Sequence, residues 1–231
     1  MRIINECTST NASIDRESRH GEALLALTQT AGRGQRGNTW ESEPHKNITM
    51  SVMLRPTDLP TIRQFEISQA VALAVVDLLE RLMIKDVKVK WPNDVYVGDK
   101  KICGILIENS LNGAMISRSI VGIGLNVNQT KFLSDAPNPV SIKQLTGEKE
   151  YDIIELANEL IDNVLKRLGK DNKAEYRQRL WRGKGKWAWQ TADGLQFNAE
   201  IVEVLSDGRL VLSNQPNPFA FKEVKPLGFA N

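Results

Sequence analysis

Residues 87–108 read Val87-Lys88-Val89-Lys90-Trp91-Pro92-Asn93-Asp94-Val95-Tyr96-Val97-Gly98-Asp99-Lys100-Lys101-Ile102-Cys103-Gly104-Ile105-Leu106-Ile107-Glu108, and this stretch decides the fold. Short β-branched runs alternate here with turn residues: Pro92 ends the first run, and Gly98-Asp99-Lys100 is a hairpin signature. A further strand is expected at Met115–Val127. Strands separated only by turns predict a meander of antiparallel neighbours, not the alternating strands and helices of a parallel sheet.

The segments before and after this meander predict more strands and several helices. Residues 65–83 carry apolar side chains at helical spacing, and Ala70–Val76 is apolar nearly all round, which predicts a helix buried against a sheet. In Asn47–Arg55 apolar and less apolar residues alternate, as in a half-buried strand. The remaining expected elements are strands at Met1–Cys7 and Ala23–Leu27, a helix from the polar run Thr8–Ser13 towards Ser18, and helices at Ser141–Leu145, Ile153–Leu168 and Lys173–Trp181.

A domain boundary is expected at Gly183-Lys184-Gly185. Beyond it, Gln196–Leu205 and Arg209–Ser213 flank the turn Ser206-Asp207-Gly208, and Ala220–Val224 is expected as a final strand. Such short strands predict a small barrel. We therefore expect an α+β protein in which a mainly antiparallel or mixed sheet packs with helices over residues 1–182, followed by a small β-barrel over residues 183–231.

Composition excludes several classes of function. The chain has 231 residues, 41% of them hydrophobic, and a net charge of +2, so no global field points to nucleic acid or a membrane. No long apolar span and no signal-peptide core occur, which predicts a cytoplasmic protein with no membrane partner. Cys7 and Cys103 are expected to be buried thiols. His20 and His45 have no neighbours at ligand spacing, which argues against zinc.

The loop Gly32-Arg33-Gly34-Gln35-Arg36-Gly37-Asn38-Thr39-Trp40 has the chemistry to order around a small anion. Its glycines let backbone N–H groups approach a ligand, and its arginines supply forked donors for carboxylate or phosphate. The G-x-G-x-x-G pattern also suggests a dinucleotide fingerprint, but residues 38–47 lack the helix that such a site requires. Taken alone, the loop could equally be a flexible surface hairpin.

Three separated motifs carry a resemblance to a known family. They are the loop Gly32–Trp40, the run Lys90-Trp91-Pro92-Asn93-Asp94 with Lys101–Glu108 after it, and Gly122-Ile123-Gly124-Leu125-Asn126-Val127-Asn128. In this order the motifs closely resemble those of the biotin–protein ligases, over nearly the whole chain. The resemblance implies a fold like that of class II aminoacyl-tRNA synthetases and biotin ligases, with an SH3-like C-terminal barrel. It implies activation of biotin by ATP and Mg²⁺ as biotinyl-5′-adenylate, followed by transfer to one lysine of a biotin carboxyl carrier domain.

The same resemblance implies roles for individual residues. Catalysis is expected of Arg33 and Lys101, which would bring carboxylate and phosphate together, and of Asp94, which could accept the proton of the incoming lysine. The residues expected to bind biotin are Ser9, Thr10, Asn11, Gln29, Arg33, Gly34, Gln35, Lys101 and Gly104. Those expected to bind ATP or the adenylate are Arg36, Trp40, Asn93 and Asn126. No metal ligand is assigned.

Structural explanations compete with each of these roles. Ser9 and Thr10 could cap a helix, Asp94 could be turn chemistry, Lys100 and Lys101 could form a solvated hairpin tip, and Gly122 and Gly124 could let a helix pack closely. The ordered set of motifs favours the functional interpretation. Many members of the family that this chain resembles have arginine in place of Gln35, so one positive charge beside the phosphates is expected to be missing or replaced here.

Two other functions are kept as alternatives. One is a lipoate-type protein ligase of the same fold. The other is a nucleic-acid-binding module, because Trp181, Trp187 and Trp189 alternate with basic residues, although tryptophans also suit a seam between domains. Ser9–Asn11 lies within a dozen residues of Met1. We therefore expect the single-function form of the ligase, without a DNA-binding domain or a DNA partner, as a monomer or homodimer.

Overall fold

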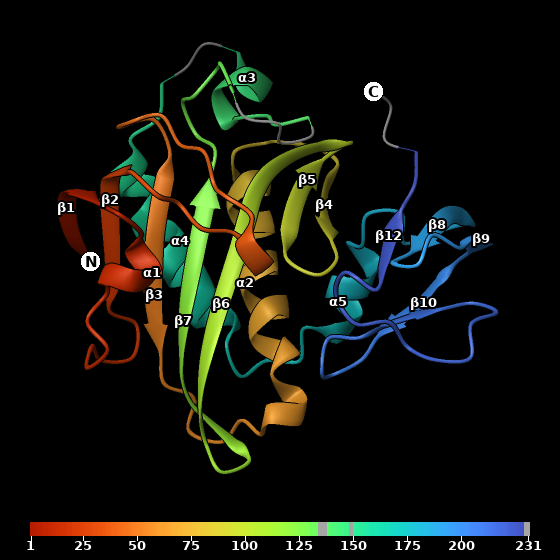
Figure 1. Ribbon diagram of the computed structural model, residues 1–231. Helices are drawn as coiled ribbons and strands as arrows, with labels where there is room; N and C mark the ends of the chain where they lie inside the picture. Colours follow the sequence, from red (N-terminus) through yellow and green to blue (C-terminus); the bar gives the residue numbers. More distant parts are fainter. Residues whose placement is uncertain (134–137, 148–149, 229–231) are drawn as a thin grey trace.

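The protein was analysed as a computed structural model that describes residues 1–133, 138–147 and 150–228, except for the side chain of Arg36. A seven-stranded mixed sheet forms its centre (Figure 1), in the order β1-β2-β3-β7-β6-β5-β4. The strands of this sheet are β1 (Arg2–Cys7), β2 (Ala23–Gln29), β3 (Ile48–Leu54), β4 (Val87–Lys90), β5 (Asp94–Val97), β6 (Lys100–Asn112) and β7 (Met115–Leu125). Only β1 and β2 pair in parallel. The fold class and the meander predicted from residues 87–127 are therefore confirmed.

Helices cover both faces of the sheet unequally. The two long helices, α2 and α4, lie together behind it, and the single-turn helix α1 lies on the opposite face against β2, β3 and β7 (Figure 1). The helices are α1 (Thr10–Ser13), α2 (Phe65–Arg81), α3 (Ile142–Thr146), α4 (Ile153–Arg167) and α5 (Lys173–Gln178), with 3-10 turns η1 (Gln35–Gly37) and η2 (Thr61–Arg63). Within the described residues, no helix combines the length and apolar character needed to cross a membrane.

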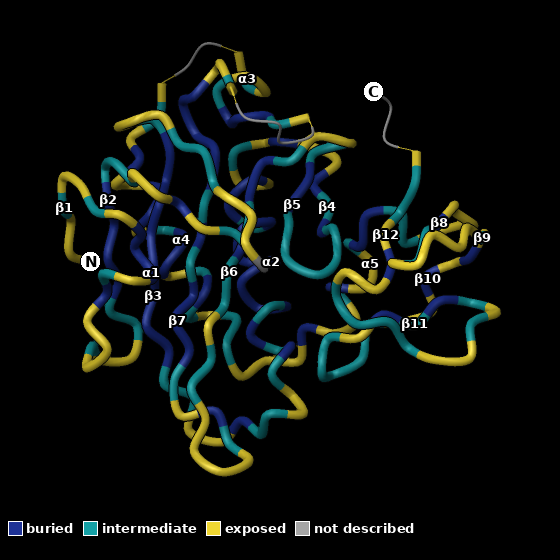
Figure 2. Tube along the Cα trace, in the orientation of Figure 1, coloured by how far each residue is buried: buried dark blue, intermediate teal, exposed yellow. Residues whose placement is uncertain are grey.

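The core lies between α2, α4 and the sheet. Residues 70–76 of α2 are all buried, as their sequence predicted, and Figure 2 shows burial concentrated in α2 and the central strands. Strand β3 differs from expectation, because all of its residues are buried. Thr49 and Ser51 face the α1 side, where hydrogen bonds to Ala26 O, Thr10 and Asn11 satisfy their hydroxyls. Burying them therefore leaves no unpaired polar group.

Two predicted helices are shorter than their sequences suggested. The first ends at Ser13 rather than near Ser18, and Ser9 stands at its N-cap without a side-chain capping bond. The last ends at Gln178 rather than Trp181, because Arg182 takes a positive φ and residues 179–181 return to the sheet, where Trp181 N–H donates to Val89 O. Cys103 is buried as expected, whereas Cys7 is only partly buried.

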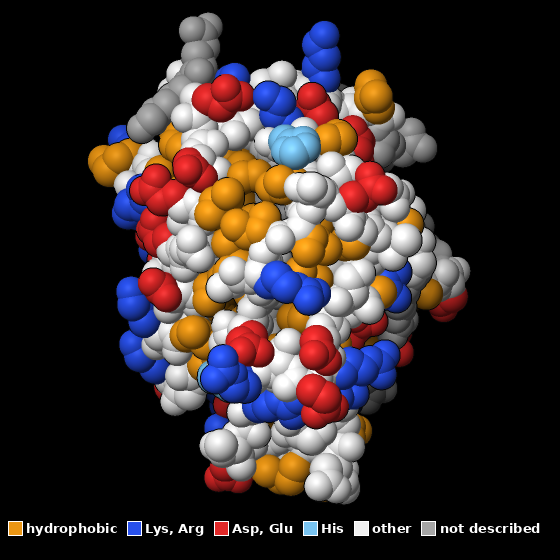
Figure 3. Space-filling view, turned by 90° about the vertical axis from the view of Figure 1, so that its left-hand side faces the viewer, with side chains coloured by type: hydrophobic (Ala, Val, Ile, Leu, Met, Phe, Trp, Pro, Cys, Tyr) orange, Lys and Arg blue, Asp and Glu red, His pale blue; other side chains and the backbone are white. Residues whose placement is uncertain are grey.

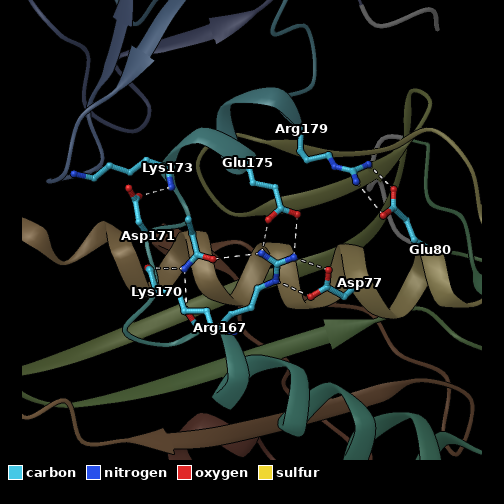
Figure 4. A network of polar contacts seen from close by, with 9 residues as sticks. Asp77, Glu80, Arg167, Lys170, Asp171, Lys173, Glu175 and Arg179 are labelled. Atoms are coloured by element: carbon cyan, nitrogen blue, oxygen red, sulfur yellow. Dashed lines mark hydrogen bonds and ion pairs between the residues drawn. The ribbon is translucent and has the colours of Figure 1, made fainter.

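A charged network fastens α5 to the core (Figure 4). Arg167 of α4 bonds Asp77 of α2 through Nε at 2.6 Å and Glu175 of α5 through Nη1 at 2.7 Å. Arg179 makes a second bridge from the end of α5 to Glu80 of α2. The bidentate geometry around Arg167, whose side chain is 15% exposed, makes this network more than a set of solvated surface pairs. It fixes the point from which the chain leaves for its C-terminal strands.

The described C-terminal strands form two small antiparallel sheets, and no closed barrel is detected among them. The strands are β8 (Trp187–Thr191), β9 (Gln196–Ala199), β10 (Ile201–Val204), β11 (Leu210–Leu212) and β12 (Val224–Pro226). Strand β8 was not predicted, and the strand expected at Ala220–Val224 begins only at Val224. Trp91 Nε1 donates to Gly208 O at 2.8 Å, so this part packs directly against the meander.

The face on the β1 side of the molecule carries apolar side chains at its centre with charged groups around them (Figure 3). Strand β1 forms this edge of the sheet, and Ile3 within it is 42% exposed. The opposite edge is covered, because β4 bonds the residues that follow α5.

Candidate active site

A cavity of about 780 Å³ opens over the sheet face that carries α1. A volume of this size is typical of sites for small molecules and cofactors. The cavity brings together thirteen of the predicted site residues: Ser9, Thr10, Asn11, Gln29, Arg33, Gly34, Gln35, Trp40, Asn93, Asp94, Lys101, Gly104 and Asn126. The side chain of Arg36 lies outside the described part of the chain. The predicted site residues therefore lie around one cavity, and their individual roles remain predictions.

A row of paired residues crosses the floor of the cavity. Lys90 pairs with Asp94, Asp94 with Gly104, and Gly104 with Gly124, on strands β4, β5, β6 and β7. The two glycines seat the indole of Trp40: a Cβ on Gly124 would lie 2.4 Å from the ring and one on Gly104 would lie 2.9 Å from it. Since no real Cβ approaches this closely, only glycine permits a flat ring at this place. The buried Nε1 of Trp40 has no partner among the described residues.

The loop that carries Trp40 is folded as a closed hairpin. Arg33 bridges Thr39, Trp40 N–H donates to Gly32 O at 2.9 Å, and Gly34 N–H donates to Asn38 O at 2.7 Å. A 3-10 turn rather than a helix follows the glycines. The dinucleotide-binding interpretation is therefore excluded by the missing helix, as the sequence suggested.

One end of the cavity is a buried polar cluster. Thr10 N–H donates to Gln29 Oε1 at 2.8 Å, and Ser51 Oγ lies 2.8 Å from Thr10 Oγ1 and 2.6 Å from Asn11 Oδ1. Asn11 Nδ2 donates to Glu108 Oε2 at 2.8 Å. Because these side chains are held by hydrogen bonds to one another, the cluster is rigid and presents its remaining donors and acceptors in fixed directions.

Gly122 makes room for this cluster. A Cβ on Gly122 would lie 2.4 Å from Asn11 Oδ1. Close packing of a helix against this glycine, the structural explanation considered from the sequence, is therefore correct for Gly122. The helix concerned carries predicted ligand-binding residues, so the close approach serves the site as well.

Charged side chains line the same cavity. Lys101 Nζ is 2.7 Å from Asp94 Oδ1, and it stands 5.6 Å from the centre of the Trp40 ring. The side chain of Lys101 thus lines the cavity and does not extend into solvent from a hairpin tip. Arg33 Nη2 is 3.8 Å from Glu108 Oε2, with both side chains nearly half exposed, a contact weak enough for a ligand carboxylate to replace.

Asn93 and Asn126 each donate a side-chain hydrogen bond to a backbone carbonyl beside the cavity. Asn93 Nδ2 donates to Ile105 O at 2.8 Å, and its Oδ1 accepts no hydrogen bond from the residues that the structure describes. Asn126 Nδ2 donates to Val140 O at 3.1 Å and so fixes the segment that pairs with Lys101. Asp94 begins β5 after the turn formed by residues 91–93. Asp94 therefore lies at the start of a strand and lines the cavity. A role in forming the turn does not by itself explain a carboxylate at this position.

Lys90 and Tyr96 complete the wall towards the C-terminal sheets. Lys90 Nζ donates to Tyr96 Oη at 3.1 Å and lies 4.9 Å from the centre of that ring. Burial lowers the pKa of Lys90 from its usual value, against the opposing effect of Asp94. Burial likewise raises the pKa of Tyr96, so the phenol remains protonated. Phe221 reaches the same wall from the C-terminal segment.

The tryptophans that suggested nucleic-acid binding are engaged within the protein. Trp181 Nε1 donates to Asp99 at 3.0 Å, Trp189 is buried with Nε1 donating to Ala199 O, and the guanidinium of Arg182 lies over both Trp181 and Trp187. These contacts support the alternative interpretation of a seam between the two parts of the chain.

Among the residues to which sequence reasoning gave no role are Lys90 and Phe221, which line the cavity, and Ser51 and Glu108, which bond Asn11 beside it. A serine inside an apolar strand is a signal that could have identified Ser51, because a buried hydroxyl needs partners. Glu108 was quoted within a motif but given no role. Phe221 carried no local signal, since only the packing of the C-terminal segment brings it to the cavity.

Comparisons with known proteins agree with this geometry. Residues 6–126 match the Biotin/lipoate A/B protein ligase family. The biotin–[acetyl-CoA-carboxylase] ligase of Mycobacterium tuberculosis is 31% identical over 176 residues, which are 73% of this chain and 64% of that protein. The bifunctional ligase/repressor BirA of Bacillus spizizenii is 37% identical over 134 residues, 56% of this chain. The match spans about 40% of the length of that relative.

Among solved structures, the biotin protein ligase of Aquifex aeolicus in complex with biotin and ATP superposes with a TM-score of 0.80. The alignment covers 98% of both chains at 23% sequence identity. At that identity the likeness establishes the fold of this chain, including the C-terminal sheets, and leaves its chemistry to be argued from its own residues.

Proposed function

Because the chain belongs to the Biotin/lipoate A/B protein ligase family, we propose that it activates biotin with ATP as biotinyl-5′-adenylate and transfers the biotinyl group to a lysine of a biotin carboxyl carrier domain. The observation that carries this proposal is the set of groups gathered around one cavity. Thr10, Asn11 and Gln29 present uncharged polar groups, Lys101 and Arg33 supply positive charge beside Asp94, and Trp40 offers a flat ring. Together they fit a ligand with a polar ring, a carboxylate and a nucleotide.

The first half-reaction needs positive charge. An oxygen of the biotin carboxylate attacks the α-phosphorus of ATP, a P–O bond forms, and the bond to the leaving pyrophosphate breaks. Two anions must meet for this to happen, and Lys101 and Arg33 line the place where they would meet. Fixed cations aimed at the developing charge stabilise such a transition state.

The second half-reaction needs a proton acceptor. The neutral amine of the carrier lysine attacks the carbonyl carbon of the mixed anhydride, the amide bond forms and AMP leaves. Lysine is protonated at neutral pH, so a group near the anhydride must take up its proton. Asp94, whose side chain is 16% exposed in the cavity wall, is the carboxylate proposed for this role.

Mg²⁺ is proposed to enter with ATP. Within the described residues, no group of three or more His, Cys, Asp or Glu side chains could hold a metal alone. This fits Mg²⁺, which is commonly held by phosphate oxygens, water and one or two protein oxygens. The free Oδ1 of Asn93 is the proposed protein contact. The ion supplies charge neutralisation of the phosphates when bound.

Lipoate, the substrate of the alternative ligase, would fit the polar cluster less well than biotin. A dithiolane ring carries no N–H or C=O group, so it would leave the cluster of Thr10, Gln29, Ser51 and Asn11 facing a nonpolar ligand. Desolvating polar groups without partners is costly. A cyclic urea offers both kinds of hydrogen-bonding group and fits the cluster better. We also propose the division at residues 182 and 183, with the C-terminal sheets contributing Phe221 to the cavity wall.

The test is to mix the protein with biotin, MgATP and a biotin carrier domain and to weigh the carrier. We expect a mass gain of one biotinyl group and pyrophosphate release that depends on biotin. Lys101→Ala should abolish most of this activity, whereas Lys100→Ala, at the exposed hairpin tip next to it, should not. Labelling with lipoate in place of biotin would favour the alternative ligase.

A further inference from the structure

Glu108 stands next to the polar cluster without contributing an obvious ligand contact, and the geometry points to a specific role for it. We propose that its carboxylate sets the direction of a hydrogen-bond chain through Asn11 and Ser51, so that Thr10 can only accept an N–H from the ligand. Glu108 would then select a cyclic urea over rings that lack an N–H. The inference rests on the proposed function, since it concerns how biotin is chosen.

The first link is the orientation of the Asn11 amide. Its Nδ2 lies 2.8 Å from Glu108 Oε2 and 3.4 Å from Leu106 O. An ionised carboxylate and a backbone carbonyl are both pure acceptors, so the atom that faces them must be the NH₂ group. The Oδ1 of Asn11 therefore faces the other way, towards Ser51, and it can only accept.

The second link is the single proton of Ser51. Its Oγ lies 2.6 Å from Asn11 Oδ1, and the side chain is fully buried. Since Oδ1 has no proton, Ser51 must donate to it. A serine hydroxyl has only one proton, so Ser51 has none left for its other neighbour.

The third link reaches the ligand site. The hydroxyl oxygens of Ser51 and Thr10 are 2.8 Å apart, and a contact between hydroxyls can run in either direction. With the Ser51 proton already used, the proton in this contact must come from Thr10. Gln29 Oε1 can also accept this proton, but it lies farther away, at 3.2 Å, and the shorter contact with Ser51 has no other proton to fill it. Thr10 Oγ1 then presents only lone pairs to the cavity.

The matching ligand group follows from these directions. Gln29 Oε1 is occupied by the Thr10 N–H, so its Nε2 remains as the donor side of the amide. An acceptor at Thr10 and a donor at Gln29, both lining the cavity, complement adjacent N–H and C=O groups in one ring. A ring without an N–H would leave the lone pairs of the buried Thr10 oxygen without a donor from the ligand, which makes binding weaker.

Reversing the charge at position 108 tests whether Glu108 sets the donor and acceptor directions of these hydrogen bonds. Glu108 is nearly half exposed, so the substitution Glu108→Lys can be accommodated, and a lysine would turn the Asn11 amide and reverse every link. Adding Asn11→Asp would restore the direction, because a carboxylate at position 11 would accept from both the new lysine and Ser51. Glu108→Gln can donate or accept and should lie between these cases. Glu17→Lys, a charge reversal at an exposed position, is the control.

The readout is calorimetric binding of biotin and of biotin methylated on either ureido nitrogen, without ATP. Wild type should prefer biotin over one of the methylated isomers by roughly tenfold or more, since the methyl group removes the N–H that Thr10 accepts. Glu108→Lys should weaken biotin binding roughly 10- to 100-fold by the same cost and bring the preference close to unity. The double variant should recover the preference, and Glu17→Lys should keep it.

Two results would overturn the inference. One is a Glu108→Lys variant that keeps the wild-type preference for biotin over the methylated isomers. The other is a folded double variant that shows as little preference as Glu108→Lys alone. If Glu108→Lys does not fold, as judged by circular dichroism, the double variant and Glu108→Gln decide the question in the same way. A wild-type protein that binds no biotin and releases no biotin-dependent pyrophosphate would instead remove the proposed function itself.

Discussion

Lys101 and Asp94 neutralise each other across the cavity wall, with Nζ 2.7 Å from Oδ1. The contact is electrostatic, since Oδ1 accepts no hydrogen bond of good geometry among the described residues. The two residues are proposed to serve different half-reactions. A ligand carboxylate that draws Lys101 away would therefore also release the carboxylate of Asp94, so that the proton acceptor becomes free when the anhydride forms.

Substitutions at these two positions should separate the half-reactions. Lys101→Ala removes a charged transition-state contact, which typically costs about 2.7–4 kcal/mol, so adenylate formation should fall by roughly 10²–10³-fold. Asp94→Asn should instead act more strongly on transfer to the carrier. Pyrophosphate release and carrier labelling are measured separately, with Lys100→Ala as the matched control. Equal losses in both steps for both variants would contradict the assignment.

Because Lys101 and Asp94 form an ion pair, the effects of substituting them should depend on each other. Removing Lys101 leaves Asp94 in the wall without its cation, so part of the effect of Lys101→Ala arises from an unpaired carboxylate. We expect the double variant Lys101→Ala/Asp94→Asn to lose less than the sum of the two single losses in adenylate formation. Strict additivity in a double-mutant cycle would mean that the pair is not coupled.

The glycine seat of Trp40 gives a second prediction. Gly124→Ala would place a Cβ 2.4 Å from the indole, so the ring must leave its place. If Trp40 contacts the nucleotide, the KM for ATP should rise by roughly tenfold or more, while binding of biotin alone changes less. Ser117→Ala, on the same strand but at an exposed position, is the control. An unchanged KM for ATP would separate Trp40 from nucleotide binding.

Local patterns predicted much of the fold, because the meander of residues 87–127 depends on alternation and turn chemistry that lie within the sequence. What the sequence could not reveal are the partners that meet only after folding. The burial of Ser51 depends on α1 crossing its strand, and the contact of Glu108 with Asn11 joins residues 97 positions apart. The hairpin of the loop Gly32–Trp40 likewise closes through backbone bonds that composition does not indicate.

The buried Lys90 should make stability depend on pH in a definite direction. Its folded-state pKa is lowered by burial, so the cost of holding its charge is complete below that pKa. The cost disappears as pH rises through the ordinary lysine value of about 10.4, where both folded and unfolded chains are neutral at this position. The stability of Lys90→Met relative to wild type should therefore be highest near neutrality and decline towards pH 10.

Thermal melts of both proteins between pH 6 and pH 10 measure this trend. Each kcal/mol of difference shifts the Tm by about 2–4 °C in a chain of this size. Lys88→Met, on the same strand, reports the effect of losing a lysine that does not line the cavity. A relative stability of Lys90→Met that increases with pH would contradict burial as the dominant influence on Lys90.

Gln35, the uncharged residue between Arg33 and Arg36 in the loop, gives the last prediction. Gln35 opens the 3-10 turn of the loop and lines the cavity, and its buried Oε1 has no partner among the described residues. The amide can donate hydrogen bonds to ligand oxygens, but it adds no positive charge. A charged hydrogen bond contributes about 1.5–3 kcal/mol over none, and a neutral one already supplies part of this.

We therefore expect Gln35→Arg to slow release of the adenylate by about tenfold or less, because about 1.4 kcal/mol corresponds to a factor of ten. Carrier labelling should continue, since Arg33 and the backbone N–H groups of the loop are unchanged. Gln35→Met, which keeps the length of the side chain and removes its hydrogen bonds, should have the opposite effect. The measurement is a chase of labelled adenylate from the three proteins. If Gln35→Arg releases it at the wild-type rate or faster, the side chain at position 35 points away from the ligand, and loop charge does not set how long the adenylate stays.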